Sequence, residues 1–136
     1  MIYVYTDGAS RGNPGMAAAG FMIFKGTQKV FEDFRYLGIA TNNEAEYKAL
    51  IFAMKKAKMI DKNASIFSDS ELMIKQLTGI YRVKSERLRE LFRTVKDLER
   101  EFLHVSYQNL PRENEGIAAV DKKLNMLLNS IGREDL

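Results

Sequence analysis

Four acidic residues of this sequence stand where its pattern places strand ends or inward-facing helix positions: Asp7, Glu46, Asp69 and Asp121. Asp7 ends the β-branched and aromatic run 2–6, and Asp69 ends the run 64–68, so each is expected at the end of a strand. Glu46 and Asp121 share helical spacing with apolar residues, which directs both towards the core. Inward-facing carboxylates repel one another unless their pKa values rise or cations bind them.

The ligand types indicate which cation this set would take. There is no cysteine, and the single histidine, His104, lies within a predicted strand as a half-buried residue. Oxygen ligands select Mg²⁺ or Mn²⁺ rather than Zn²⁺. Two such ions can clamp the attacking and leaving oxygens of a phosphodiester, so the pattern predicts metal-assisted phosphodiester hydrolysis. For any one carboxylate alone, a capping or surface charge is the alternative interpretation.

The eight residues after Asp7 contain three glycines and one proline. Glycine permits close backbone contact and positive φ angles, which a loop that contacts a phosphate backbone requires. An ordinary tight turn is the alternative interpretation.

The predicted elements that position these residues are strands followed by alternating strands and helices. Alternation of this kind indicates an α/β fold with a mixed sheet, whose parallel strand ends point to a common crevice. We expect strands at 2–6, 16–24, 29–37, 64–68 and 103–107, and helices from 41–43 to about 60, then at 70–77, 85–102 and 116–130.

The composition sets the scale of the molecule. With 136 residues, of which 46% are hydrophobic, the chain is expected to form a single domain over 1–136, with 132–136 as a frayed tail. The absence of cysteine excludes disulfides and thiolate metal sites and favours a reducing, cytoplasmic location for a soluble protein. A net charge of +3 is compatible with a polyanionic partner.

Three blocks of the sequence resemble type 1 ribonuclease H in order and spacing: 5–15 (YTDGASRGNPG), 41–47 (TNNEAEY) and 68–70 (SDS). The segment 79–84 before a long helix resembles compact members of that family, which lack a basic protrusion. The resemblance covers nearly the whole chain. It implies the ribonuclease H-like fold, a five-stranded mixed sheet with helices on both faces.

The resemblance also implies an activity, namely endonucleolytic hydrolysis of the RNA strand of RNA/DNA hybrids by two-metal-ion catalysis. The products would carry 3′-hydroxyl and 5′-phosphate ends. It assigns metal ligation to Asp7, Glu46 and Asp69. We expect Asp121 to be the fourth catalytic carboxylate and to help hold the second of two Mg²⁺ ions, for which Mn²⁺ can substitute. The implied partner is an RNA/DNA hybrid; we expect a monomer with no obligate protein partner and no membrane association.

By the same resemblance, Asn13 and Thr41 hold a phosphate of the DNA strand. Ser10, Asn42, Asn43 and Glu71 lie along the minor groove of the hybrid, where the 2′-hydroxyl distinguishes RNA from DNA. Asn42 and Asn43 have an alternative role as helix caps.

The sequence departs from the family pattern before its last helix. The loop at 109–114 contains no histidine, and Val120 stands where the family has alanine. Arg112 is expected to substitute in positioning or product release, as a cation that cannot shuttle protons. Glu113 or Glu115 can replace Asp121 as the fourth carboxylate if the extra residues shift the helix; we favour Asp121 because its stripe faces the core.

Other functions use similar residues. A non-catalytic module that binds hybrids is expected to lack one or more of the carboxylates. A DNA-acting nuclease of the same fold is expected to lack the groove residues at 41–43 and to carry further DNA-binding segments. A metal that only stabilises the fold leaves the groove residues without a use.

Overall fold

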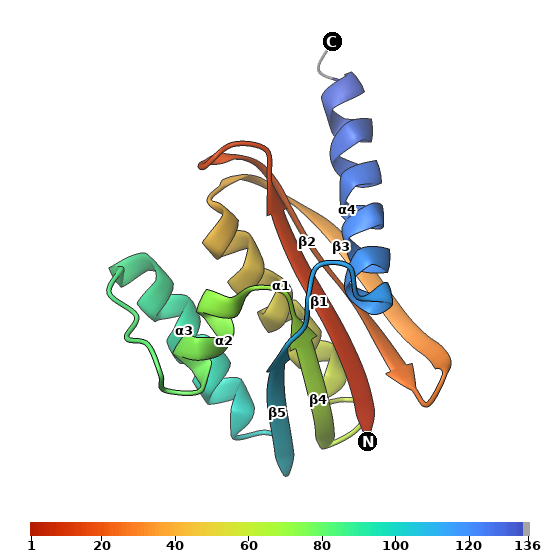
Figure 1. Ribbon diagram of the computed structural model, residues 1–136, viewed down its shortest axis with the longest axis vertical. Coiled ribbons are helices and arrows are strands. Elements are labelled where there is room, and N and C mark those ends of the chain that lie inside the picture. The colour runs from red at the N-terminus through yellow and green to blue at the C-terminus, as the bar shows by residue number, and fades with distance from the viewer. Residues whose placement is uncertain (135–136) are drawn as a thin grey trace.

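The computed structural model describes residues 1–134, which form five strands and four helices (Figure 1). In chain order these are β1 (Ile2–Ser10), β2 (Gly15–Lys25), β3 (Gln28–Ala40), α1 (Asn42–Ala57), β4 (Asn63–Ser68), α2 (Glu71–Leu77), α3 (Glu86–Glu99), β5 (His104–Asn109) and α4 (Glu115–Glu134). Every predicted element is present, although several ends differ by a few residues.

The strands form one mixed sheet in the order β3-β2-β1-β4-β5. The first three strands are an antiparallel meander, whereas β1, β4 and β5 run parallel. The predicted five-stranded mixed sheet is therefore confirmed.

Asp7 does not end β1, which corrects the prediction from its sequence. The strand continues to Ser10 because β2 pairs with it antiparallel as far as Ser10↔Ala17. Its parallel pairing with β4 stops earlier, at Tyr5↔Phe67. Asp7 therefore lies just beyond the point where the two parallel strands separate, which is the crevice expected for a ligand site in such a sheet.

Helices cover both faces of the sheet, as expected (Figure 1). On one face, Ile2 and Val4 of β1 pack with Leu50 and Met54 of α1, and α3 packs outside α1. On the other, α4 lies over β1, β2 and β3. Burial of these apolar side chains stabilises the layers and fixes α1 and α4 against the central strand that carries Asp7.

Polar caps determine where the helices begin. Thr41 starts α1 through a reciprocal capping box with Glu44, and the Ser70 hydroxyl accepts a hydrogen bond from the Met73 amide to start α2. Within the described residues α4 continues to Glu134, so 132–134 of the expected tail are helical, while 135–136 lie outside the description. None of the described helices has the length and hydrophobicity needed to span a bilayer.

Candidate functional site

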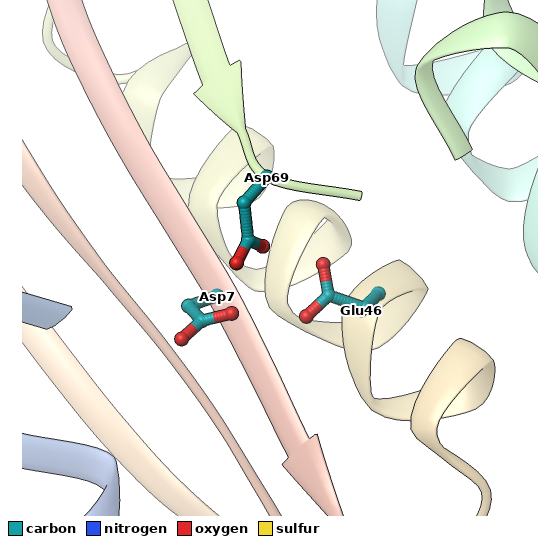
Figure 2. Close-up of side chains that lie close together, drawn as sticks. All are labelled: Asp7, Glu46 and Asp69. Carbon is teal, nitrogen blue, oxygen red and sulfur yellow. The ribbon is translucent and has the colours of Figure 1, made fainter. Parts of the chain in front are cut away.

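Three of the four predicted carboxylates meet at one point. Asp7 comes from β1, Glu46 from α1, and Asp69 follows β4 directly; Figure 2 shows their carboxylates pointing towards one another. Each offers an oxygen, and these oxygens lie within 4.8 Å of one another. Asp7 and Glu46 are buried and Asp69 is partly buried. The three side chains thus form a candidate cation site.

Hydrogen bonds hold Glu46 in this orientation. Its Oε1 accepts from the Gly8 amide at 2.7 Å, and its Oε2 accepts from the Ser68 hydroxyl at 3.3 Å. A Cβ atom at Gly8 would lie 2.3 Å from the backbone carbon of Ala45. This glycine therefore provides the close contact between β1 and α1, whereas the sequence pattern predicts it to be part of a ligand-binding loop.

The site disfavours three negative charges in the absence of a cation. Burial raises the pKa of Asp7 well above its ordinary value, and the charges of Glu46 and Asp69 raise it further. Burial also raises the pKa of Glu46. Burial raises the pKa of Asp69, and the nearby Arg112 guanidinium opposes that effect. A hard divalent cation would compensate these charges, so the donor set fits Mg²⁺ or Mn²⁺.

The three carboxylates open into a hollow of about 330 Å³, which we call the acidic hollow. Its other polar lining residues are Ser10, Arg11, Asn42, Ser70, Arg112, Asp121 and Asn125. Asp121 lies outside the group of three but close enough that its charge raises the pKa of Asp7.

The two alternatives to Asp121 lie elsewhere. Glu115 lines a separate hollow beside the rings of Tyr5 and Phe24, and Glu113 is exposed and does not line the acidic hollow. Of the three candidates for the fourth carboxylate, Asp121 is the one that lines the acidic hollow.

The predicted groove residues gather where the β1–β2 loop meets α1. The Ser10 hydroxyl donates to the Ala40 carbonyl oxygen at 2.8 Å, and the Asn13 side-chain oxygen accepts from the Asn42 amide at 3.1 Å. Thr41 is the cap of α1, so the asparagines after it are not needed as caps. The side chains of Asn42 and Asn43 are exposed, which leaves their polar atoms accessible to a ligand.

Glu71 and His104 lie apart from that junction. Glu71 is in the first turn of α2 and forms an ion pair with Lys75. His104 is the first residue of β5, at the opposite end of the parallel strands, and it is exposed rather than half-buried as predicted.

Two residues of the acidic hollow are not predicted from the sequence, namely Arg11 and Asn125. Asn125 follows Asp121 by four positions in α4, so helical spacing is a signal that places both on one face. No comparable signal exists for Arg11, whose place depends on how the β1–β2 loop folds against α4.

A mixed sheet with a carboxylate cluster beside its central parallel strands defines a class of α/β proteins with a candidate metal site. Within this class, the family model of RNase H matches residues 1–119. The chain therefore belongs to the RNase H family, and the resemblance seen in the sequence is confirmed.

Similar proteins support this assignment. "Ribonuclease HI" of Halobacterium salinarum is 38% identical over 113 residues, which are 82% of this chain and 57% of that protein. "Bifunctional protein Rv2228c" of Mycobacterium tuberculosis is 33% identical over 114 residues, which are 82% of this chain and 31% of that protein. The chain thus spans between about a third and somewhat over half of the length of these relatives.

Solved structures show the same fold. The crystal structure of RNase H1 from Halobacterium salinarum has a TM-score of 0.89 and 36% identity, and the match covers 95% of this chain and 98% of that one. The structure of LC11-RNase H1 in complex with an RNA/DNA hybrid has a TM-score of 0.83 and 33% identity, with 94% and 99% covered. The ribonuclease H-like fold is therefore confirmed.

Proposed function

We propose that this protein is an endoribonuclease that hydrolyses the RNA strand of RNA/DNA hybrids and leaves 3′-hydroxyl and 5′-phosphate ends. The observation that carries the proposal is the group formed by Asp7, Glu46 and Asp69, within 4.8 Å of one another, in a chain of the RNase H family. The complex of LC11-RNase H1 with an RNA/DNA hybrid supports the substrate class.

Divalent cations would be held by these three carboxylates, with Asp121 contributing to a second ion. We propose two Mg²⁺ ions, for which Mn²⁺ can substitute because it takes the same oxygen ligands. Such ions supply Lewis acidity and make water a nucleophile at neutral pH. The residues of the chain supply position: Gly8 and Ser68 orient Glu46, and Arg112 lies close enough to Asp69 to influence its charge.

Arg112 has a role that follows from its chemistry. A guanidinium group stays protonated at neutral pH and presents a fork of N–H donors that matches phosphate oxygens. We therefore propose that Arg112 positions the reacting phosphate or assists release of the product, and that it transfers no proton.

We propose that the junction of the β1–β2 loop with α1 binds the hybrid and distinguishes its RNA strand from its DNA strand. We propose that Ser10, Asn42 and Asn43, together with Glu71 from α2, contact the minor groove, and that Asn13 and Thr41 hold a phosphate of the DNA strand. The exposed side chains of Asn42 and Asn43 support this, since amides offer a donor and an acceptor to a 2′-hydroxyl and a base edge.

We further propose that residues 1–136 act as one domain, as a monomer in the cytoplasm. One set of packed layers around a single sheet supports the first part. The absence of cysteine from the sequence is consistent with a reducing compartment.

The test is cleavage of a hybrid with a labelled RNA strand in Mg²⁺, alongside double-stranded RNA, double-stranded DNA and a sample without metal. We expect metal-dependent cutting of the RNA in the hybrid. Asp69→Asn keeps the shape of the side chain and removes a ligand charge, so kcat should fall by about a thousandfold or more while the thermal unfolding transition remains.

Asp97→Asn is the matched control, because Asp97 is an exposed carboxylate near the end of α3. Asp121→Asn and Glu115→Gln separate the candidates for the fourth carboxylate, and only the first should lose activity.

Activity retained by Asp69→Asn contradicts the metal site. A wild-type chain that binds the hybrid without cutting it is instead a binding module, and one that cuts double-stranded DNA belongs to a different class of nuclease.

A further inference from the structure

Two arginines line the acidic hollow, and only one of them has been given a role so far. Arg112 lies near Asp69, whereas Arg11 reaches from the β1–β2 loop to α4. We propose that Arg11, held by Asn125, binds the phosphodiester of the RNA strand next to the one that is cleaved. This inference rests on the proposed function and adds a phosphate subsite to it.

The first step is that Arg11 is held in place. Its Nη2 donates to the main-chain oxygen of Asn125 at 3.2 Å and to the Oδ1 of the same residue at 3.3 Å. The side-chain nitrogen of Asn125 donates in turn to the main-chain oxygen of Asp121 at 3.0 Å. The Arg11 backbone amide donates to the Met16 carbonyl oxygen at 2.8 Å, which closes the loop at its base. Arg11 is thus tied to the helical turn that carries Asp121.

The second step is that, within the described residues, no carboxylate forms an ion pair with the Arg11 guanidinium, although four carboxylates line the same hollow. Within residues 1–134 its side-chain hydrogen bonds run through Nη2 to a neutral amide residue, and it forms no ion pair. Three of the other exposed arginines have carboxylate partners, namely Arg35 with Asp33, Arg87 with Glu44 and Arg100 with Asp97, whereas Arg89 donates only to main-chain oxygens. A guanidinium has five N–H donors, so Nε and Nη1 of Arg11 remain available to an anion.

The third step identifies the strand. Arg11 lines the same hollow as the carboxylates beside which the cleaved phosphate would lie. We therefore assign the phosphate bound by Arg11 to the same strand as the cleaved phosphate. Successive phosphates of one strand of a DNA duplex rise about 3.4 Å along the helix axis, so a strand whose cleaved phosphate lies at the carboxylates would bring the next phosphate within reach of the same hollow. Asn13 and Thr41, the candidates for the DNA strand, lie instead at the start of α1.

The experiment measures binding rather than cleavage. Asp69→Asn serves as the parent, in Mg²⁺, because it should bind the hybrid without cutting it. Adding Arg11→Ala should raise the Kd about tenfold, the typical loss for one hydrogen-bonded charge contact. It should also reduce the slope of log K against log salt by about 0.9, the value for one phosphate contact. In the otherwise unaltered chain, KM should rise by a similar factor with kcat nearly constant.

Replacing single phosphates of the hybrid by uncharged linkages shows which phosphate Arg11 contacts. A series of hybrids, each with one methylphosphonate in either strand, is titrated with the parent and with the Arg11→Ala variant. At one RNA-strand position next to the cleaved phosphate, the neutral linkage should weaken the parent about tenfold and leave the variant unchanged. If no such position exists, or if it lies in the DNA strand, the inference is overturned.

Three further variants serve as controls. Arg100→Ala removes the same charge at the C-cap of α3, far from the hollow, and should leave the Kd within about twofold. Asn125→Ala should weaken binding less than Arg11→Ala, while Asn125→Asp should weaken it more than Asn125→Ala, because the new carboxylate competes for the guanidinium. Thermal unfolding confirms that each variant is folded.

The two proposals fail in different ways. A wild-type chain that neither binds nor cuts the hybrid contradicts the proposed function. A parent that binds, together with an Arg11→Ala variant of equal Kd and equal salt slope, contradicts only the subsite.

Discussion

At the scale of single residues, Asp7 links the candidate site to the stability of the protein. Burial and the neighbouring Glu46 raise the pKa of Asp7 above its ordinary 3.8. The native carboxyl therefore binds its proton more tightly than the unfolded chain does. Its contribution to folding is complete below pH 3.8 and is lost as the pH rises towards the native pKa.

The resulting prediction is that Asp7→Asn stabilises the protein when metal is absent. At pH 8 in a chelator, the variant should melt about 5 °C or more above the wild type, because Asp7 is ionised in the unfolded chain and must take up a proton to fold, whereas an amide needs none. The difference should shrink as the pH is lowered towards 4. Thermal unfolding at several pH values measures this, with Asp97→Asn as a control; a difference that does not change with pH rules out ionisation of Asp7 as its cause.

The residues of the site also show what a sequence can reveal. Asp7, Glu46 and Asp69 are predictable because each either follows an apolar run directly or lies on an apolar helix stripe, where local pattern alone signals an unusual carboxylate. The pairing of Arg11 with Asn125 joins the start of the chain to its last helix. Such a contact depends on how elements distant in the sequence pack together, so the periodicity of residues within one element does not predict it.

At the scale of elements, the contact between β1 and α1 depends on Gly8. A methyl group there would lie 2.3 Å from the backbone carbon of Ala45, so one of the two elements has to move. We predict that Gly8→Ala destabilises the fold by about 3 kcal/mol and weakens metal binding, since moving β1 away from α1 lengthens the hydrogen bond from the amide of residue 8 to Glu46.

Gly132→Ala is the matched control for that change. Gly132 lies in α4, and a methyl group on it would meet nothing within 4 Å apart from the neighbouring backbone of its own helix, so the substitution should be neutral or stabilise by up to about 1 kcal/mol. Denaturant unfolding gives the stabilities, and calorimetric titration with Mn²⁺ gives the metal affinities. Equal stability of Gly8→Ala and the wild type contradicts the proposed close contact.

Elements are predicted well where side chains mark their ends. Thr41 and Ser70 cap α1 and α2 at the starts that the sequence predicts for these helices, because a capping residue acts locally. The end of β1 is predicted too early for a non-local reason. One edge of that strand pairs with β4 only to Tyr5, but the other pairs with β2 to Ser10. The sequence of a strand does not show how far its pairing with each of its two neighbouring strands extends.

At the scale of the whole molecule, the candidate metal site joins three elements that lie apart in the first half of the chain. Asp7, Glu46 and Asp69 are fixed to β1, α1 and the end of β4, and they come together only in the native state (Figure 2). A cation that binds all three binds the unfolded chain much more weakly. Metal binding should therefore stabilise the fold as a unit.

We predict that Mg²⁺ at about 100 times its Kd raises the free energy of unfolding by about 2.7 kcal/mol. The melting temperature should rise with metal concentration in the wild type and in Asp97→Asn, and much less in Asp69→Asn, whose amide is a weaker ligand. Scanning calorimetry over a range of Mg²⁺ concentrations measures this. An equal rise in Asp69→Asn places the cation elsewhere, whereas a rise in the wild type without cleavage of the hybrid shows that the metal only stabilises the fold.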